Sequence, residues 1–273
     1  MGANPTCQAP RPAIEPARIP ATYSNLHLLR ELIKRDLTAR FTGSALGLAW
    51  AILQPLSLVL VYWFVFTFMI PGGRAGGTGD QYIYFLIAGL LPWLGLSEGL
   101  SRSTTAIVEN SAIVRRLPLR SELLVIVPNA TAMIFECVAL AIFVIALAFK
   151  GMPLRNLWIL PVALVLQFLL QVGAGLFLAT MYVFFRDVTQ ILGFVLAIAF
   201  YLSPILYPVA GRFEKFFFWN PMTPLLGLFR SAMLASPLPD AGSFVFLLTT
   251  AAVLCFGGLL FFRRAQPSLV DVI

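Results

Sequence analysis

The ionisable side chains of this 273-residue chain are few, and their spacing argues against catalysis by the chain itself. Its 12 acidic residues are scattered, whereas a membrane-embedded enzyme such as a lipid-linked glycosyltransferase would need a carboxylate cluster at the interface. One histidine and three widely separated cysteines do not support a metal centre or a disulfide framework. None of the three lysines follows a glycine, so no G-x-x-x-x-G-K-[ST] loop is present. We therefore expect no catalytic residue, no metal and no cofactor.

Glu136 is the acidic residue whose position calls for an explanation, because it falls inside the apolar segment 123–149. A carboxylate at membrane depth is costly and is expected to face the interior of a helix bundle. It could take part in a proton relay, with Glu98 as a second member, or it could be hydrogen-bonded to Asn129, Thr131 or a neighbouring helix. A relay would usually need further acidic or histidine partners at depth, so the structural role is favoured.

Composition places the chain among polytopic membrane proteins. It is 59% hydrophobic and 11% charged, with a mean hydropathy of +0.88, whereas a soluble domain has about 25% charged residues. The net charge of +7 would suit a nucleic-acid partner, but the basic residues lie beside apolar segments. That arrangement is typical of the positive-inside rule. We therefore expect a membrane location and no nucleic acid.

The apolar segments predict an all-α fold with six transmembrane helices, since about 20 residues cross a bilayer. The predicted spans are 46–70, 81–97 with a continuation past Glu98 and Arg102, 123–149, 157–185, 188–208 and 241–262. Segment 216–229 is apolar but is too short and too rich in proline to cross. It predicts a re-entrant outer hairpin between the fifth and sixth spans.

The flanks of these spans predict domain limits and orientation. Residues 1–22 contain five prolines and no apolar periodicity, so they are expected to be a disordered cytoplasmic lead-in. Residues 23–264 form the predicted transmembrane domain, and 265–273 a cytoplasmic tail. With both termini inside, the inner segments hold 13 of the 19 Lys and Arg residues, which favours that orientation.

An amphipathic helix is predicted ahead of the first span, over residues 24–41. Apolar residues recur in it at helical spacing, and basic residues surround them, which is typical of a helix lying in the membrane interface. Arg35, Asp36 and Arg40 are its candidate functional residues. The sequence leaves two roles open: a gate helix that also touches a partner protein, or a simple interfacial anchor.

The residues that follow resemble the opening of ABC-type polysaccharide-export permeases. The resemblance is carried by Arg35-Asp36-Leu37, Arg40, Gly43-Ser44, Leu46-Gly47, Trp50 and Gln54-Pro55. The stretches 185–208 and 219–234 add a similar R-D turn, an L-S-P motif and an N-P motif, so the likeness covers about residues 24–264.

This resemblance implies the transmembrane subunit of a type-2 ABC exporter in the bacterial inner membrane. Such a subunit would form a homodimer and bind two copies of a separate cytoplasmic ATPase. It would move a lipid-linked glycan outward, with O-antigen, capsule and teichoic-type polymers all open. A drug or lipid exporter of the same fold is the alternative. An ion-coupled carrier is less favoured, because it would need paired intramembrane charges and an inverted repeat.

The resemblance also implies roles for two connecting segments. The loop between the second and third spans resembles the ATPase-coupling helix, with candidate residues Glu109, Asn110, Arg115, Arg116, Leu117 and Pro118. Its arginines could instead serve only to set the topology. The hairpin after the fifth span resembles the outer gate, with candidate residues Trp219, Asn220 and Pro221.

Aromatic residues are candidates for lining a glycan path, because their faces stack on the C–H faces of sugars. The candidates are Trp50, Tyr62, Phe66, Tyr201 and Tyr207. For most aromatic residues of the chain, the favoured alternative is a belt at the lipid interface. The first and fifth spans are the expected dimer interface.

Overall fold

The structure is a computed structural model that describes residues 25–40, 47–50, 53, 56–57, 60–61, 64–65, 79–112, 121–208 and 217–272. Every regular element in these ranges is helical, and they contain no strand. The elements are α1 (Asn25–Ala39), the 3-10 helix η1 (Gly47–Ala49), α3 (Gly79–Glu109), α5 (Glu122–Phe149), α6 (Ile159–Phe184), α7 (Val188–Leu202), α9 (Met222–Leu234) and α10 (Ala241–Val272). The all-α prediction is confirmed for this part of the chain.

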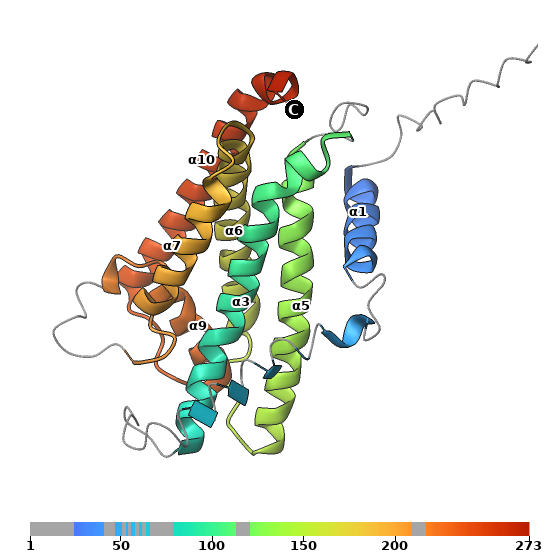
Figure 1. Cartoon of the computed structure of the whole chain (residues 1–273). Coiled ribbons are helices and arrows are strands. Elements are labelled where there is room, and N and C mark those ends of the chain that lie inside the picture. Colours follow the sequence, from blue (N-terminus) through green and yellow to red (C-terminus); the bar gives the residue numbers. More distant parts are fainter. Residues whose placement is uncertain are drawn as a thin grey trace, which may run out of the picture.

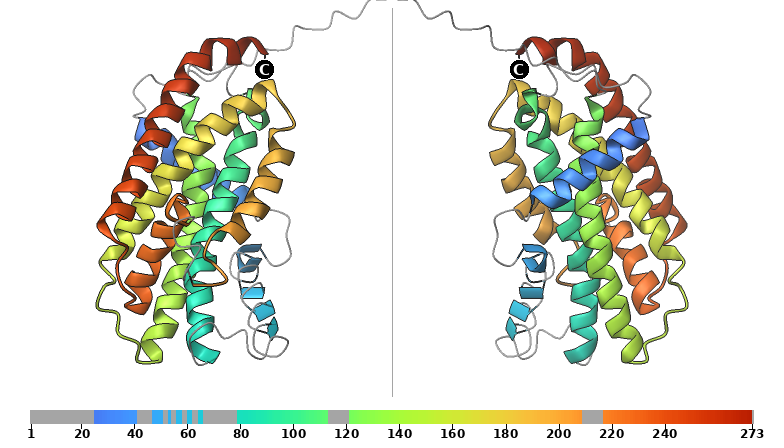
Figure 2. Two further views of the ribbon diagram at one scale, coloured as in Figure 1. Left: turned by 90° about the vertical axis from the view of Figure 1, so that its left-hand side faces the viewer. Right: turned by 90° about the vertical axis from the view of Figure 1, so that its right-hand side faces the viewer.

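Four of the described helices are long and apolar enough to cross a membrane: α3, α5, α6 and α10. They lie side by side; α3, α6 and α10 run in one direction and α5 runs in the opposite one (Figures 1 and 2). Leu90, Leu140 and Leu166 belong to the main apolar core, each at most 4% exposed. The predicted third and fourth spans match α5 and α6 to within two residues.

Two helix ends differ from the sequence expectation. The predicted fifth span reaches residue 208, but α7 ends at Leu202, because Ser203 has an extended backbone and Pro204 follows it. The predicted sixth span stops at residue 262, but α10 continues to Val272 through most of the expected tail. Its last turns bend over the end of the bundle (Figure 2), and Pro267 lies inside that part of the helix.

The short helix α9 fills one half of the bundle rather than crossing it (Figure 1). It has 13 residues, and most of them are buried against α3 and α6. The chain then leaves α9 and reaches Asp240, whose carboxylate accepts the backbone N–H and the hydroxyl of Ser243 at 3.0 and 2.6 Å. These two hydrogen bonds lower the pKa of Asp240, and they cap the N-terminus of α10.

Several expectations fall outside the described residues. They include the lead-in at 1–22, most of the predicted first span at 46–70, and residues 113–120 of the loop between α3 and α5. In Figure 1, α1, the end of α3 and the end of α10 lie toward the same end of the bundle, whereas α9 lies in the opposite half.

Candidate functional site

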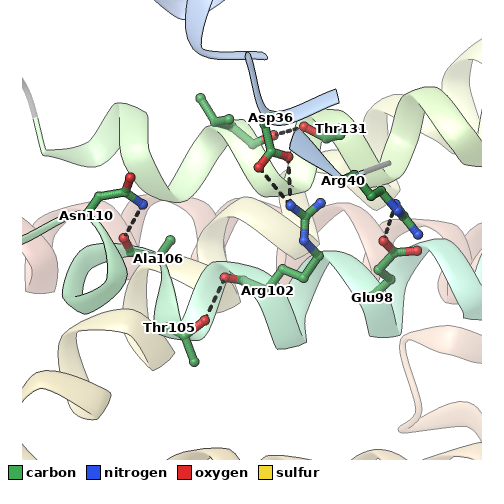
Figure 3. Close-up of polar contacts among 9 residues, drawn as sticks. Asp36, Arg40, Glu98, Arg102, Thr105, Ala106, Asn110 and Thr131 are labelled. Atoms are coloured by element: carbon green, nitrogen blue, oxygen red, sulfur yellow. Dashed lines mark hydrogen bonds and ion pairs between the residues drawn. The ribbon is translucent and has the colours of Figure 1, made fainter. Parts of the chain in front are cut away.

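Two ion pairs join the N-terminal helix α1 to the transmembrane helix α3. Asp36 lies in the last turn of α1 and Arg40 directly follows that helix, and they face Arg102 and Glu98, one turn apart on α3. Arg102 Nη2 donates to both carboxylate oxygens of Asp36 at 2.8 Å, and Arg40 forms an ion pair with Glu98. Figure 3 shows both pairs. We call these four residues the α1–α3 ion-pair cluster.

The cluster is partly shielded from solvent, which strengthens its electrostatic contribution. The side chains of Asp36 and Arg40 are 24% and 20% exposed. The guanidinium carbon of Arg40 also lies 4.4 Å from the ring centroid of Phe135, which belongs to α5. Breaking one partner of such a pair leaves the other charge partly desolvated, and that is costlier than breaking a fully exposed pair. Helix α1 is thus held to two transmembrane helices.

A cavity of about 280 Å³ lies beside this cluster. On α1 it is lined by Leu32, Arg35, Asp36 and Ala39, at the end of α3 by Glu109 and Asn110, and on α5 by Leu124, Val127 and Pro128. It brings together candidate residues from two predicted sites that are more than 70 positions apart in the sequence. Glu109 and Asn110 are the first residues of the predicted coupling segment, so that segment begins next to α1.

In the opposite half of the bundle, the start of α9 is fixed to the end of α7. The side-chain amide of Asn220 donates to the carbonyl of Leu202 at 3.1 Å, and its oxygen accepts the N–H of Met222 at 2.9 Å. Trp219 is 73% exposed and packs edge-on against Phe246 of α10. The candidate hairpin residues Trp219 and Asn220 therefore connect the start of α9 to α10 and to the end of α7.

Arg230 on α9 is a polar residue that the sequence reasoning did not select. It is 7% exposed, and its guanidinium donates to the carbonyl oxygens of Ile205 and Phe85 at 3.2 and 3.4 Å. The ring centroid of Phe85 lies 3.5 Å from the guanidinium carbon. Arg230 therefore ties α9 to the segment after α7 and to α3.

The other candidate residues are only partly placed. Trp50 and Tyr201 are 48% and 64% exposed on this single chain, and the Tyr207 hydroxyl donates to the carbonyl of Tyr201. The path residues Tyr62 and Phe66 lie outside the described residues, as do the coupling residues Arg115, Arg116, Leu117 and Pro118. Nothing in the structure assigns a path role to the aromatic residues.

Glu136 is hydrogen-bonded to a neighbouring helix, as its structural interpretation expected. Its partner is Gln167 of α6, whose Nε2 donates to Glu136 Oε2 at 2.6 Å. The sequence reasoning selected neither Gln167 nor Arg102, and it named Glu98 only as a second member of a proton relay with Glu136. The signal available for that cluster was the shared order of an acidic residue followed four positions later by an arginine, in Asp36/Arg40 and again in Glu98/Arg102.

The fold and the ion-pair cluster define a helical membrane protein whose N-terminal helix is fastened to its spans. The chain matches the ABC-2 type transporter family over residues 27–234, and because this match covers most of its length, the chain belongs to that family. The family is one of permease subunits of ABC transporters.

The curated relatives of the chain match it over nearly their whole length. It is 25% identical to the O-antigen export system permease protein RfbA of Myxococcus xanthus, over 92% of this chain and 97% of the relative. A protein of the same name from Klebsiella pneumoniae is 24% identical, over 90% and 95%. The polysialic acid transport protein KpsM of Escherichia coli is 23% identical, over 88% and 93%.

Proposed function

We propose that this chain is the transmembrane subunit of an ATP-driven exporter that moves a lipid-linked polysaccharide out of the cytoplasm. The observation that carries the proposal is the match, over nearly their whole length, to relatives named for export of O-antigen and transport of polysialic acid. Both substrates are polysaccharides, although they differ in chemistry. The shared architecture therefore points to the class of substrate rather than to one glycan.

The proposed topology has six spans, a re-entrant outer hairpin and both termini in the cytoplasm. The distribution of lysine and arginine supports this orientation. The shortness and burial of α9 support a hairpin that enters the membrane and returns. In this arrangement α1, the α3–α5 loop and the end of α10 face the cytoplasm. Residues 1–22 are the cytoplasmic lead-in, 23–264 the permease domain and 265–273 the tail.

The proposed assembly is a homodimer with two copies of a cytoplasmic ATPase. The segment from Glu109 to Pro118 docks on the ATPase, and its movement is passed along α3. The α1–α3 ion-pair cluster carries that movement to the interface helix, because Asp36 and Arg40 are bound to α3 close to the start of the loop. The first and fifth spans then separate, and a path lined by aromatic residues such as Trp50 and Tyr201 opens between the two copies.

A double charge reversal tests the docking role of the loop. Arg115→Glu combined with Arg116→Glu is expected to weaken co-purification of the ATPase by about tenfold or more, which corresponds to about 1.4 kcal/mol of binding free energy. The control is Arg155→Glu, an exposed position in the connection between α5 and α6 at the other end of the bundle (Figure 1). Undiminished ATPase binding by the double variant would refute the docking assignment.

A further inference from the structure

A buried polar seam runs between α3, α5 and α6, and no role has been assigned to it so far. Each helix contributes residues at spacings of four or seven, so that they share one face. The seam consists of Gly95, Gly99 and Ser103 on α3, Asn129 and Glu136 on α5, and Gln167, Gln171 and Gly175 on α6. The side-chain-bearing members are at most 4% exposed.

The glycines of the seam make room for the polar side chains. A Cβ atom at Gly95 would overlap the carboxylate of Glu136. A Cβ atom at Gly99 would lie 2.8 Å from Asn129 Oδ1 and 3.3 Å from Gln171 Nε2. These glycines therefore hold the polar groups of the two other helices directly against the backbone of α3.

The seam contains more hydrogen-bond acceptors than donors. Among the described residues, four of its buried side-chain oxygens have no partner, and one buried nitrogen, Gln171 Nε2, has none. The four oxygens are Asn129 Oδ1, Glu136 Oε1, Gln167 Oε1 and Gln171 Oε1. Gln171 Nε2 carries two N–H groups, so even if both turned to these oxygens, two acceptors would still remain. The hydroxyl of Ser103 does not supply a donor for these oxygens, because it already donates to the carbonyl of Leu100.

A ligand that fits this seam must supply hydrogen-bond donors at two levels along the helix axes, one beside Asn129 and one beside Glu136. Asn129 and Glu136 are seven residues apart, which is about 10 Å along a helix. One cation cannot coordinate oxygens at both levels, and a proton on Glu136 would serve only its own level. Water brings two donors per molecule, and buried water typically satisfies polar groups that protein atoms leave unpaired. Water is therefore the chemical class that matches.

We propose that the seam binds a short chain of internal water molecules, and that these waters let α3 shift against α5 and α6. Bonds through water can exchange partners during such a shift, whereas direct bonds would have to break. Helix α3 is the element that would move, because it carries Arg102 and Glu98 of the ion-pair cluster and leads into the coupling loop. The shift rests on the proposed export function, but the binding of water does not.

Gln171→Met tests the proposal, because methionine keeps the length of the side chain and removes both unpartnered amide atoms. In the complete complex with its ATPase, the melting temperature is expected to stay the same or rise. Export of surface polysaccharide is expected to fall severalfold at an unchanged amount of complex. Gln190→Met is the matched control, since Gln190 is exposed on α7, and it should change neither quantity.

The water itself is tested by a structure of the wild-type complex in a lipid nanodisc, at a resolution that shows ordered water. We expect density within hydrogen-bonding distance of Asn129 Oδ1 and Gln171 Oε1. Direct contact between the two amides without such density would overturn the proposal. A markedly lower melting temperature of the Gln171→Met variant would also overturn it, and so would full export. If the density is present but the complex exports no polysaccharide, the proposed function fails while the water site stands.

Discussion

Replacing Gly258 by alanine is expected to lower the melting temperature of the protein by several degrees. A Cβ atom at Gly258 would overlap the carbonyl oxygen of Gly173, and one at Gly173 would overlap the backbone of Leu254 and Cys255. Helices α6 and α10 thus touch backbone to backbone, as small residues permit in membranes. No side-chain rotation can relieve this overlap. Overpacking of this kind costs about 1–3 kcal/mol, and each kcal/mol corresponds to about 2–4 °C in a chain of this size.

The neighbouring glycine provides the matched control for this prediction. Gly257 is exposed, and a Cβ atom there would meet no atom within 4 Å. Because alanine is the better helix former by about 1 kcal/mol, Gly257→Ala is expected to leave the melting temperature unchanged or raise it. Thermal unfolding of both variants in the same detergent checks the pair. Equal shifts of the same sign would show that the close contact between α6 and α10 is wrong.

Reversing one charge of the α1–α3 ion-pair cluster is expected to reduce export by about tenfold or more. Arg102→Asp places a carboxylate opposite Asp36, and like charges at such a distance cost several kcal/mol, with each 1.4 kcal/mol equal to a factor of ten. Adding Asp36→Arg to the same chain restores an attractive pair. The double variant is therefore expected to regain most of the export that the single variant loses.

Export of surface polysaccharide and the amount of complex in the membrane are the two measurements for this cycle. Glu31→Arg serves as the control, because Glu31 lies on the same helix with an exposed side chain, and it should retain export. If the double variant is no better than Arg102→Asp alone, the pairing of Asp36 with Arg102 does not carry movement from α3 to α1.

The spans could be predicted because long runs without charge are bounded by charged or turn-forming residues. Segment 123–149 is such a run, and it corresponds to α5, Glu122–Phe149. Helix ends were predicted less well. Pro204 stops α7 inside an apolar run, so hydrophobicity alone placed the end too late. Arg263 and Arg264 do not stop α10, because charged residues at a membrane surface are compatible with a continuing helix.

The contacts of the candidate site could not be predicted from the sequence, because they join distant segments. Asp36 and Arg102 are 66 positions apart, and only the packing of α1 over α3 and α5 brings them together. The polar seam could not be predicted from the sequence either. Glu136 stands out in an apolar run because it is charged, whereas Gln167 and Gln171 are neutral and do not interrupt the pattern. The glycines at 95 and 99 were the available signal of a close helix contact.

The central claim is that this chain is a membrane path driven by a separate motor, and reconstitution tests it most directly. The purified chain and its ATPase are placed together in proteoliposomes with a lipid-linked glycan, and movement of the glycan is followed with and without ATP. We predict transport only when both proteins and ATP are present, and no ATP hydrolysis by the membrane subunit alone. Hydrolysis by that subunit in isolation, or passage of the glycan without the ATPase, would contradict the account.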